Sequence, residues 1–155
     1  MRLSKNFTLS EFTRSNTANR KGIPNQPSEE HLHNILDLTA NVLQPIRDGL
    51  GAIRISSGYR SPRLNRSIGG SKKSQHCKGQ AADLQYWKEG RMDNKAMYDW
   101  ILKSELEFDQ LINEFDYSWL HISFKKEGNR NQVLEAYKDK DGDTAYKHAE
   151  EFKAL

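Results

Sequence analysis

The sequence predicts an α+β fold, with a mostly antiparallel sheet and helices packed on it. Apolar residues recur at helical spacing between residues 32 and 46, whereas shorter segments later in the chain alternate apolar and polar residues as strands do. These segments do not follow one another in the regular βαβ order of a parallel sheet. A chain of 155 residues fits one compact domain, and we expect a single domain over 1–155.

The first long helix is predicted to begin after Ser28. Serine is a favourable N-cap, and Glu29 and Glu30 then lie in the first turn, where the helix dipole favours acidic side chains. Pro45 is expected to kink this helix or to split off its last turn, because proline cannot donate a backbone hydrogen bond. The preceding segment, Ser15–Pro27, is rich in Asn, Gly and Pro and is predicted to be a surface loop.

Four segments are predicted to be strands. Ile53–Ser56 alternates as a half-buried strand does, and Ala81–Gln85 can form a short strand. Phe108–Phe115 and Trp119–Lys125 are expected to pair as a hairpin. A second helix, with Asp93 as its N-cap, is predicted between the second and third of these strands.

Two segments are harder to interpret from their residues. Gly58–Lys78 is dominated by Gly, Ser, Arg, Lys and Asn, and is predicted to be a long polar loop. Loops of this length inside a compact domain are usually functional or disordered. The C-terminal segment, Val133–Leu155, is predicted to form a strand or a turn followed by a helix.

The most informative run of residues ends at Asp83. His76 leaves the polar loop and Asp83 lies on the strand that follows, so the two side chains can converge on one point. His121 shares the polar face of a hairpin strand with Trp119 and is well placed to supply a third ligand. Two imidazoles and one carboxylate, with water in the fourth position, form the open coordination of a catalytic zinc site. Spacing alone would fit a core or surface pair equally well.

Composition excludes several other classes of function. The formal net charge is +3 and its basic residues are scattered, which indicates a solvated surface and no nucleic-acid partner. No apolar run approaches the roughly 18–20 residues that cross a bilayer, so no membrane insertion is expected. The first residues lack the layout of a signal peptide, which predicts synthesis in the cytoplasm. Cys77 is the only cysteine, so no intrachain disulfide can form, and we expect a monomer.

The sequence resembles the LAS-type zinc D-Ala-D-Ala peptidases, in particular the small carboxypeptidase-like domains of phages and bacteria. The metal signature of that family, Ser-x-His followed by Asp and later by Trp-x-His, stands here as Ser74, His76, Asp83, Trp119 and His121. Further matching blocks are Ser56–Pro62 and the N-terminal part from Phe7–Phe12 through Pro45–Arg47. The likeness covers residues 7–125, which leaves 126–155 as a C-terminal extension.

The resemblance implies a hedgehog/D-Ala-D-Ala-peptidase-like fold and a role for each motif residue. It implies zinc on His76, Asp83 and His121, and substrate binding by Arg60, which follows the first core strand. A guanidinium can bind a peptide carboxylate, or the oxygen of the attacked carbonyl as charge develops there. Ser74 can contact substrate or brace the loop, and Trp119 can line the substrate groove.

The general base is the point at which this sequence departs from the family. Many relatives carry Glu or Asp three residues before the last His, and Ser118 stands in that position here. A serine cannot take a proton from a metal-bound water near neutral pH without help, so Glu114 or Asp116 must replace it. We predict Glu114 as the catalytic base, with Arg60 stabilising the developing charge.

These observations predict a zinc peptidase that hydrolyses a peptide bond in bacterial peptidoglycan. The reaction can be that of a D,D-carboxypeptidase or of an L-alanyl-D-glutamate-type endopeptidase, and a phage endolysin that reaches the wall after release from the cytoplasm is one setting for it. The partner is then the peptidoglycan stem peptide. Because Ser118 replaces the usual acid, the alternative is a non-catalytic, zinc-containing module that binds the cell wall or forms part of a virion.

Overall fold

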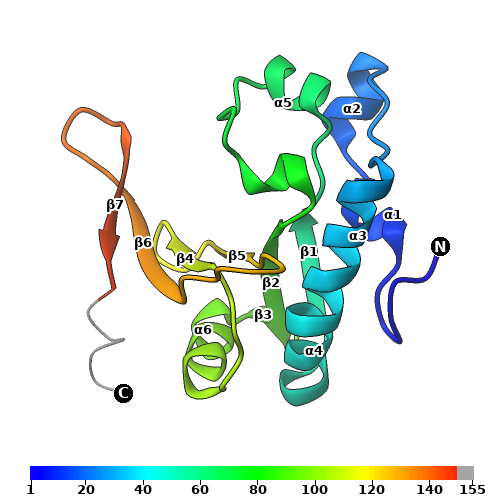
Figure 1. Ribbon diagram of the computed structural model, residues 1–155. Helices are drawn as coiled ribbons and strands as arrows, with labels where there is room; N and C mark the ends of the chain where they lie inside the picture. Colours follow the sequence, from blue (N-terminus) through cyan, green and yellow to red (C-terminus); the bar gives the residue numbers. More distant parts are fainter. Residues whose placement is uncertain (150–155) are drawn as a thin grey trace.

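The computed structural model describes residues 1–149 and consists of one sheet with helices on it (Figure 1). In that part of the chain the sheet has seven strands in the order β1-β2-β5-β4-β6-β7, with β3 paired to β2. All neighbouring strands are antiparallel except β4 and β6, which are parallel. The predicted α+β class with a mostly antiparallel sheet is therefore confirmed. The strands are β1 (Ile53–Ser57), β2 (Ala81–Lys88), β3 (Arg91–Met92), β4 (Gln110–Glu114), β5 (Trp119–Ser123), β6 (Gln132–Lys138) and β7 (Thr144–His148).

Most of the helices begin at a residue whose side chain can satisfy a free backbone N–H group. Ser28 accepts a hydrogen bond from the backbone N–H of His31, and Asp93 accepts one from that of Ala96, as N-caps do. Thr8 and Glu11 form a capping box at the first helix. The helices are α1 (Leu9–Thr13), α2 (Asn16–Lys21), α3 (Glu29–Leu38), η1 (Thr39–Leu43, a π-helix), α4 (Gln44–Leu50), α5 (Pro62–Ser67), η2 (Gln75–Lys78, a 3₁₀-helix) and α6 (Asn94–Lys103).

The predicted disturbance at Pro45 takes the form of a π-helical segment. The chain stays helical from α3 through η1 into α4, and Pro45 occupies the first turn of α4. A proline ring clashes with the carbonyl four residues earlier and offers no N–H, so a wider turn before it removes the conflict. The helix then ends at Leu50, and Gly51 caps it.

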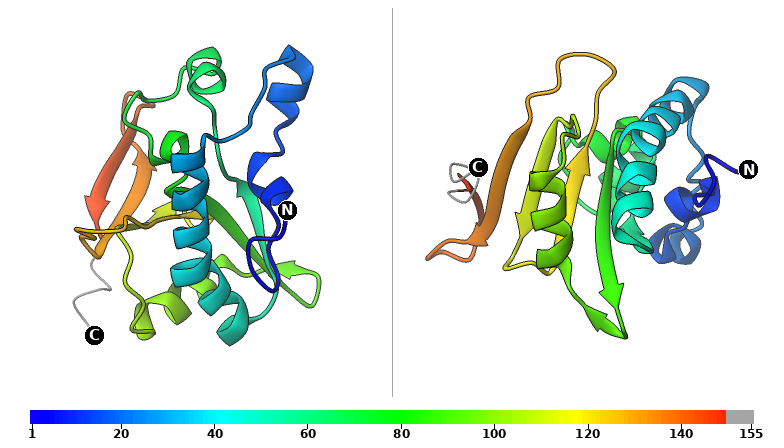
Figure 2. Two further views of the ribbon diagram at one scale, coloured as in Figure 1. Left: turned by 45° about the vertical axis from the view of Figure 1, so that its right-hand side comes forward. Right: turned by 90° about the horizontal axis from the view of Figure 1, so that it is seen from below.

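The two faces of the sheet differ because side chains alternate along every strand. One face is apolar and lies under the helices, with α6 packed on β2 and β5 (Figure 2). Its buried strand residues include Leu84, Leu111, Leu120, Ile122 and Val133, and they pack with Leu38, Val42, Met97 and Ile101 of the helices. The opposite face carries polar side chains and is not covered by these helices.

On this open face the strand register aligns the side chains in three rows. We call them the Gln110 row, the His121 row and the Glu114 row, in order along the strands. The rows are Gln110 with Gln132; Asp83 with His121, Ile112 and Leu134; and Glu114 with Trp119, Ala136 and Tyr146.

Three segments differ from the sequence-based expectation. Ser15–Pro27 contains α2, which Ser15 caps and Gly22 ends, and the loop Gly58–Lys78 contains α5 and η2. In Val133–Leu155, β6 supplies the predicted strand, but β7 stands where a helix is predicted to follow. The helix prediction is wrong for these residues because Thr144–His148 pairs with β6, and such a tertiary contact overrides local propensity. The remainder of the expected helix, 150–155, lies outside the described residues.

No helix in residues 1–149 is long and apolar enough to cross a bilayer.

Candidate metal centre and cleft

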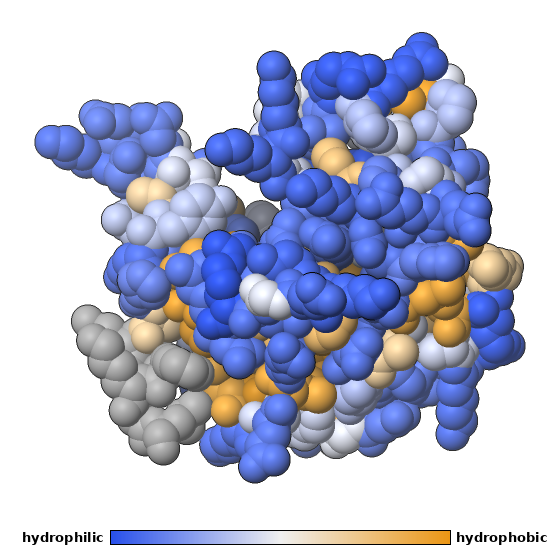
Figure 3. Space-filling view, viewed as in Figure 1, coloured by the Kyte–Doolittle hydropathy of each residue, from blue (hydrophilic) through white to orange (hydrophobic). Residues whose placement is uncertain are grey.

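A cleft of about 550 Å³ lies on the open face of the sheet. One wall consists of the three rows, and the other is the segment from Ser71 to His76. The space-filling view shows the molecule hollowed between the β6–β7 hairpin and the segment that carries α5, with mainly hydrophilic residues around the hollow (Figure 3). The cleft is therefore a polar groove between the sheet and part of the long polar segment Gly58–Lys78.

His76 is held in one orientation from both sides. Ser74 caps η2 by accepting a hydrogen bond from the backbone N–H of His76, and Gly79 ends η2 in the left-handed region. The ring Nδ1 lies 2.7 Å from the carbonyl oxygen of Gly58. Because a carbonyl can only accept, Nδ1 carries the proton and donates, and the lone pair of the neutral ring is on Nε2. His76 is 4% exposed, and its Nε2 lies 3.4 Å from Oδ1 of Asp83.

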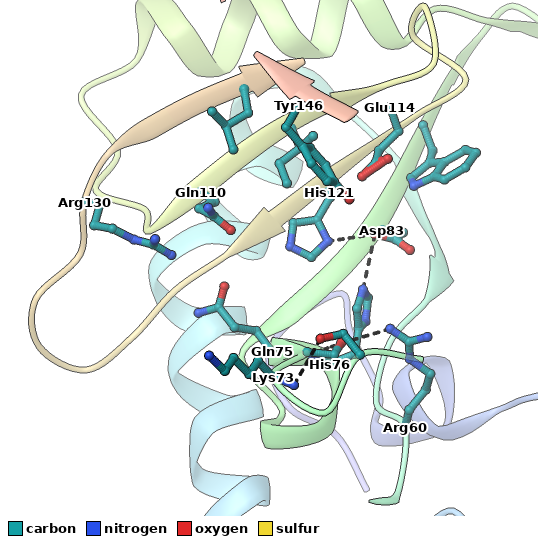
Figure 4. A pocket seen from close by; sticks show the side chains of 15 residues that line it. Arg60, Lys73, Gln75, His76, Asp83, Gln110, Glu114, His121, Arg130 and Tyr146 are labelled. Atoms are coloured by element: carbon teal, nitrogen blue, oxygen red, sulfur yellow. Dashed lines mark hydrogen bonds and ion pairs between the residues drawn. The ribbon is translucent and has the colours of Figure 1, made fainter. Parts of the chain in front are cut away.

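Asp83 and His121 face each other across β2 and β5. They are directly paired in the strand register, and Nδ1 of His121 lies 3.1 Å from the same Oδ1 of Asp83 (Figure 4). Burial alone would raise the pKa of Asp83, but the hydrogen bonds and charges of His121 and His76 outweigh it and hold that pKa well below its usual range. The carboxylate is thus ionised and faces two imidazoles.

These three side chains offer a donor set that fits zinc. One ligand atom from each of His76, Asp83 and His121 lies within 4.8 Å of the other two, and these atoms border the cleft. Zinc in catalytic sites takes three protein ligands, for example three imidazoles or two imidazoles and a carboxylate, and keeps the fourth position open. The hydrogen bond from Nδ1 of His76 to Gly58 is the kind of second contact that orients a metal-binding histidine.

Arg60 and Ser74 lie at one side of this group. Arg60 donates a hydrogen bond from Nη2 to Oγ of Ser74 at 3.0 Å, and its backbone N–H donates to the carbonyl of His76. Both side chains line the cleft, and Nε of Arg60 is buried without a partner among the described residues. Ser74 therefore braces the loop and the arginine together while it borders the cleft.

The structure separates the two candidate bases. Glu114 lies in the cleft wall beside Trp119, is 8% exposed, and its carboxylate has no hydrogen-bond partner among residues 1–149. Burial raises the pKa of Glu114; the charge of His121 opposes this rise and that of Asp83 adds to it. Asp116 is exposed in the turn between β4 and β5 and does not line the cleft. Ser118, in the position of the usual acid, donates to the carbonyl of Phe115 instead.

Sequence reasoning missed several side chains that also line the cleft, among them Gln75, Gln110, Arg130 and Tyr146. Gln75 and Gln110 come from segments already assigned, and the alternation along β4 could have placed Gln110 on the face of Glu114. Arg130 and Tyr146 lie beyond the region of family likeness, in the C-terminal extension 126–155. The sequence held no signal for these two, because their position depends on the pairing of β6 with β4.

The geometry fits one class of protein, a metal-dependent hydrolase, because His76, Asp83 and His121 could hold a metal ion at the border of a polar cleft. The family comparison agrees, since a family model described as Peptidase M15 matches residues 5–123. The chain belongs to this family, as the sequence motifs predicted, and M15 peptidases are in general zinc-dependent metallopeptidases that act on peptidoglycan. No curated protein matches the chain at a significant level.

Proposed function

We propose that this chain hydrolyses a peptide bond in the stem peptide of peptidoglycan, as a D,D-carboxypeptidase or as an endopeptidase of the L-alanyl-D-glutamate type. The observation that carries the proposal is the joint presence in one cleft of the His76–Asp83–His121 group, Arg60 and the unpaired carboxylate of Glu114. A zinc-containing module that only binds the wall would need the His76–Asp83–His121 group, but it would not need the unpaired carboxylate of Glu114 beside that group.

We assign zinc to His76, Asp83 and His121. Bound there, it would lower the pKa of a water molecule and polarise the carbonyl of the substrate. The remaining work falls to side chains of the cleft. Arg60 is held by Ser74, so it can present its guanidinium to a peptide carboxylate or to the oxygen of the attacked carbonyl.

Glu114 is the proposed general base. A base works best when its pKa lies near the working pH, and burial moves that of Glu114 upward from its ordinary value. Its carboxylate has no partner in the described residues, so it is free to take a proton from the attacking water and pass it to the leaving amine. Trp119, in the same row, offers an indole wall to the peptide.

Release of new amino groups from purified peptidoglycan, with and without a chelator, tests the proposal. We expect release by the zinc-loaded protein, no release after chelation, and mass spectra of the fragments that identify the bond. A matched variant, Glu114→Gln, should retain zinc and release amino groups about 10²–10⁴-fold more slowly. If the wild-type protein contains zinc and releases nothing from several wall types, the non-catalytic alternative replaces this proposal. A role as a phage endolysin belongs to the proposal as well, and lysis of cells whose wall is accessible from outside tests it.

A further inference from the structure

A second arginine lines the cleft and is fixed by a buried carboxylate. Asp109 has no exposed surface, and it accepts hydrogen bonds from Nε and Nη2 of Arg130 at 2.9 and 2.8 Å. The backbone N–H of Arg130 donates to the same carboxylate at 3.1 Å. The arginine side chain is half-exposed, so its position depends on this anchor and not on burial.

The anchor leaves one edge of the guanidinium free. Arginine has five N–H donors, and a forked carboxylate contact through Nε and Nη2 uses two of them. Nη1 of Arg130 has no partner among residues 1–149, and Nη2 retains a second hydrogen. The Nη1–Nη2 edge can therefore bind another carboxylate in the same forked geometry.

This end of the cleft has an excess of positive charge. Asp109 is neutralised by Arg130 and Lys125, whose Nζ lies 3.6 Å from it, and Lys73 also borders the cleft. The carboxylates among the cleft-lining residues are Asp83 and Glu114, which belong to the other two rows.

The two arginines lie on opposite sides of the proposed metal centre. Arg130 precedes β6, whose first residue pairs with Gln110, so it stands at the Gln110 end of the rows. Figure 4 shows Arg130 and Arg60 on opposite sides of the His76–Asp83–His121 group. A substrate that reaches both arginines must pass the metal centre between them.

We infer that Arg130, positioned by Asp109, binds a carboxylate of the stem peptide on the side of the cleaved bond away from Arg60. This inference rests on the proposed function, because the ligand is the substrate of that site. Two carboxylates of a stem peptide have the required chemistry: the α-carboxylate of γ-linked D-glutamate and the side-chain carboxylate of an acidic diamino acid. Asp109, which does not line the cleft, acts on the ligand only by positioning Arg130. Gln75 supports this anchor because it donates a hydrogen bond to the carboxylate of Asp109.

The test measures binding of synthetic stem tetrapeptides by calorimetry to zinc-loaded protein in a Glu114→Gln background, which separates binding from cleavage. One peptide keeps both carboxylates, a second has the glutamate α-carboxylate converted to an amide, and a third has lysine in place of the acidic diamino acid. Each is measured on the Arg130-intact protein, on Arg130→Gln, and on Arg91→Gln, an exposed residue of β3 that does not line the cleft.

Loss of the recognised carboxylate should weaken binding to the Arg130-intact protein by about 10- to 100-fold, the usual range for a hydrogen bond to a charged group. The peptide that shows this loss identifies the carboxylate. In Arg130→Gln the difference between peptides should disappear, and in Arg91→Gln it should remain. Arg130→Lys keeps the positive charge but not the forked pair of donors, so it should retain only part of the difference in affinity between the peptides. This variant replaces Arg130→Gln in the test if Arg130→Gln does not fold.

Three results would overturn the inference. Arg130→Gln weakens the binding of all peptides equally, or it leaves the difference in affinity between the peptides undiminished. The third is that the Arg130-intact protein binds no peptide measurably. Failure of the proposed function would be seen in a different measurement, the cleavage of the same peptides. In that case the wild-type protein cleaves none of the peptides, whereas their relative affinities still decide the role of Arg130.

Discussion

Replacement of Asp109 by asparagine should destabilise the protein in a way that depends on pH. Burial alone would raise the pKa of Asp109, but the hydrogen bonds and charge of Arg130, with a hydrogen bond from Gln75, lower it from the ordinary 3.8 to about 2. At 1.36 kcal/mol per pKa unit, this difference corresponds to about 2 kcal/mol of stability. For a chain of this size we expect the melting temperature to fall by about 4–8 °C at pH 7.

The direction of the pH effect follows from the lowered pKa. Between pH 4 and 2 the unfolded chain binds the proton and the folded chain does not, so the stabilisation by Asp109 is complete above about pH 4. It is lost as the pH falls through about 2, where protonated aspartic acid resembles asparagine.

Urea unfolding of wild type and Asp109→Asn between pH 7 and pH 2.5 provides the measurement. The difference in free energy of unfolding should be constant down to about pH 4.5 and should shrink below pH 4. Asp141→Asn, at an exposed position in the β6–β7 turn, makes the same change of charge and should leave stability within about 0.5 kcal/mol of wild type. A difference between Asp109→Asn and wild type that stays constant down to pH 2.5, or no difference at pH 7, would refute the reasoning.

Four further predictions concern the metal centre and its support. His76→Ala removes one of three donors and should lose bound zinc by metal analysis while its circular dichroism stays that of the wild type; retained zinc contradicts the assignment. Glu114→Gln should keep zinc and lower kcat by about 10²–10⁴-fold, the range for loss of a general base. In the wild type, the acidic limb of the pH profile of kcat/KM should lie above pH 4.5, because burial raises the pKa of Glu114 and the base must be ionised; a limb at or below that value argues for another base. Gly79→Ala should lower the free energy of unfolding by about 1–3 kcal/mol, because Gly79 has a φ of +73° and a Cβ there would lie 2.5 Å from the carbonyl oxygen of His31; urea unfolding beside Gly90→Ala, which has a similar φ and nothing within 4 Å, isolates the close contact.

The parts of the site that were predictable depend on local sequence periodicity. His76 and Asp83 lie close together in the chain, and the alternation of β5 places His121 on the face opposite to Leu120. Because a strand has a period of two, these assignments needed no knowledge of which strands pair. The choice between Glu114 and Asp116 did need such knowledge, since it depends on where β4 ends and the turn begins.

The parts that were not predictable depend on pairing between distant segments. Nothing local indicates that Gln132–Lys138 pairs in parallel with β4, or that Thr144–His148 returns as a strand where a helix is predicted. Arg130 and Tyr146 reach the cleft only through that pairing. By contrast, α2 did have a local signal, with Ser15 as N-cap and Gly22 at its end, but its Asn-rich sequence has weak helix propensity.

The parallel pairing of β6 with β4 also determines which strand forms an edge of the sheet. The family match ends at residue 123, yet a chain cut there would leave β4 as an edge strand whose backbone N–H and C=O groups face solvent beside Leu111 and Ile112. Unprotected apolar edges of this kind recruit strands from other molecules. Among residues 1–149 the edge of the sheet on this side is β7, a short strand that carries Lys147, and lysine discourages such pairing. The β6–β7 hairpin thus covers an edge that would otherwise invite aggregation, and a domain shortened to residue 123 should aggregate more readily than the longer chain.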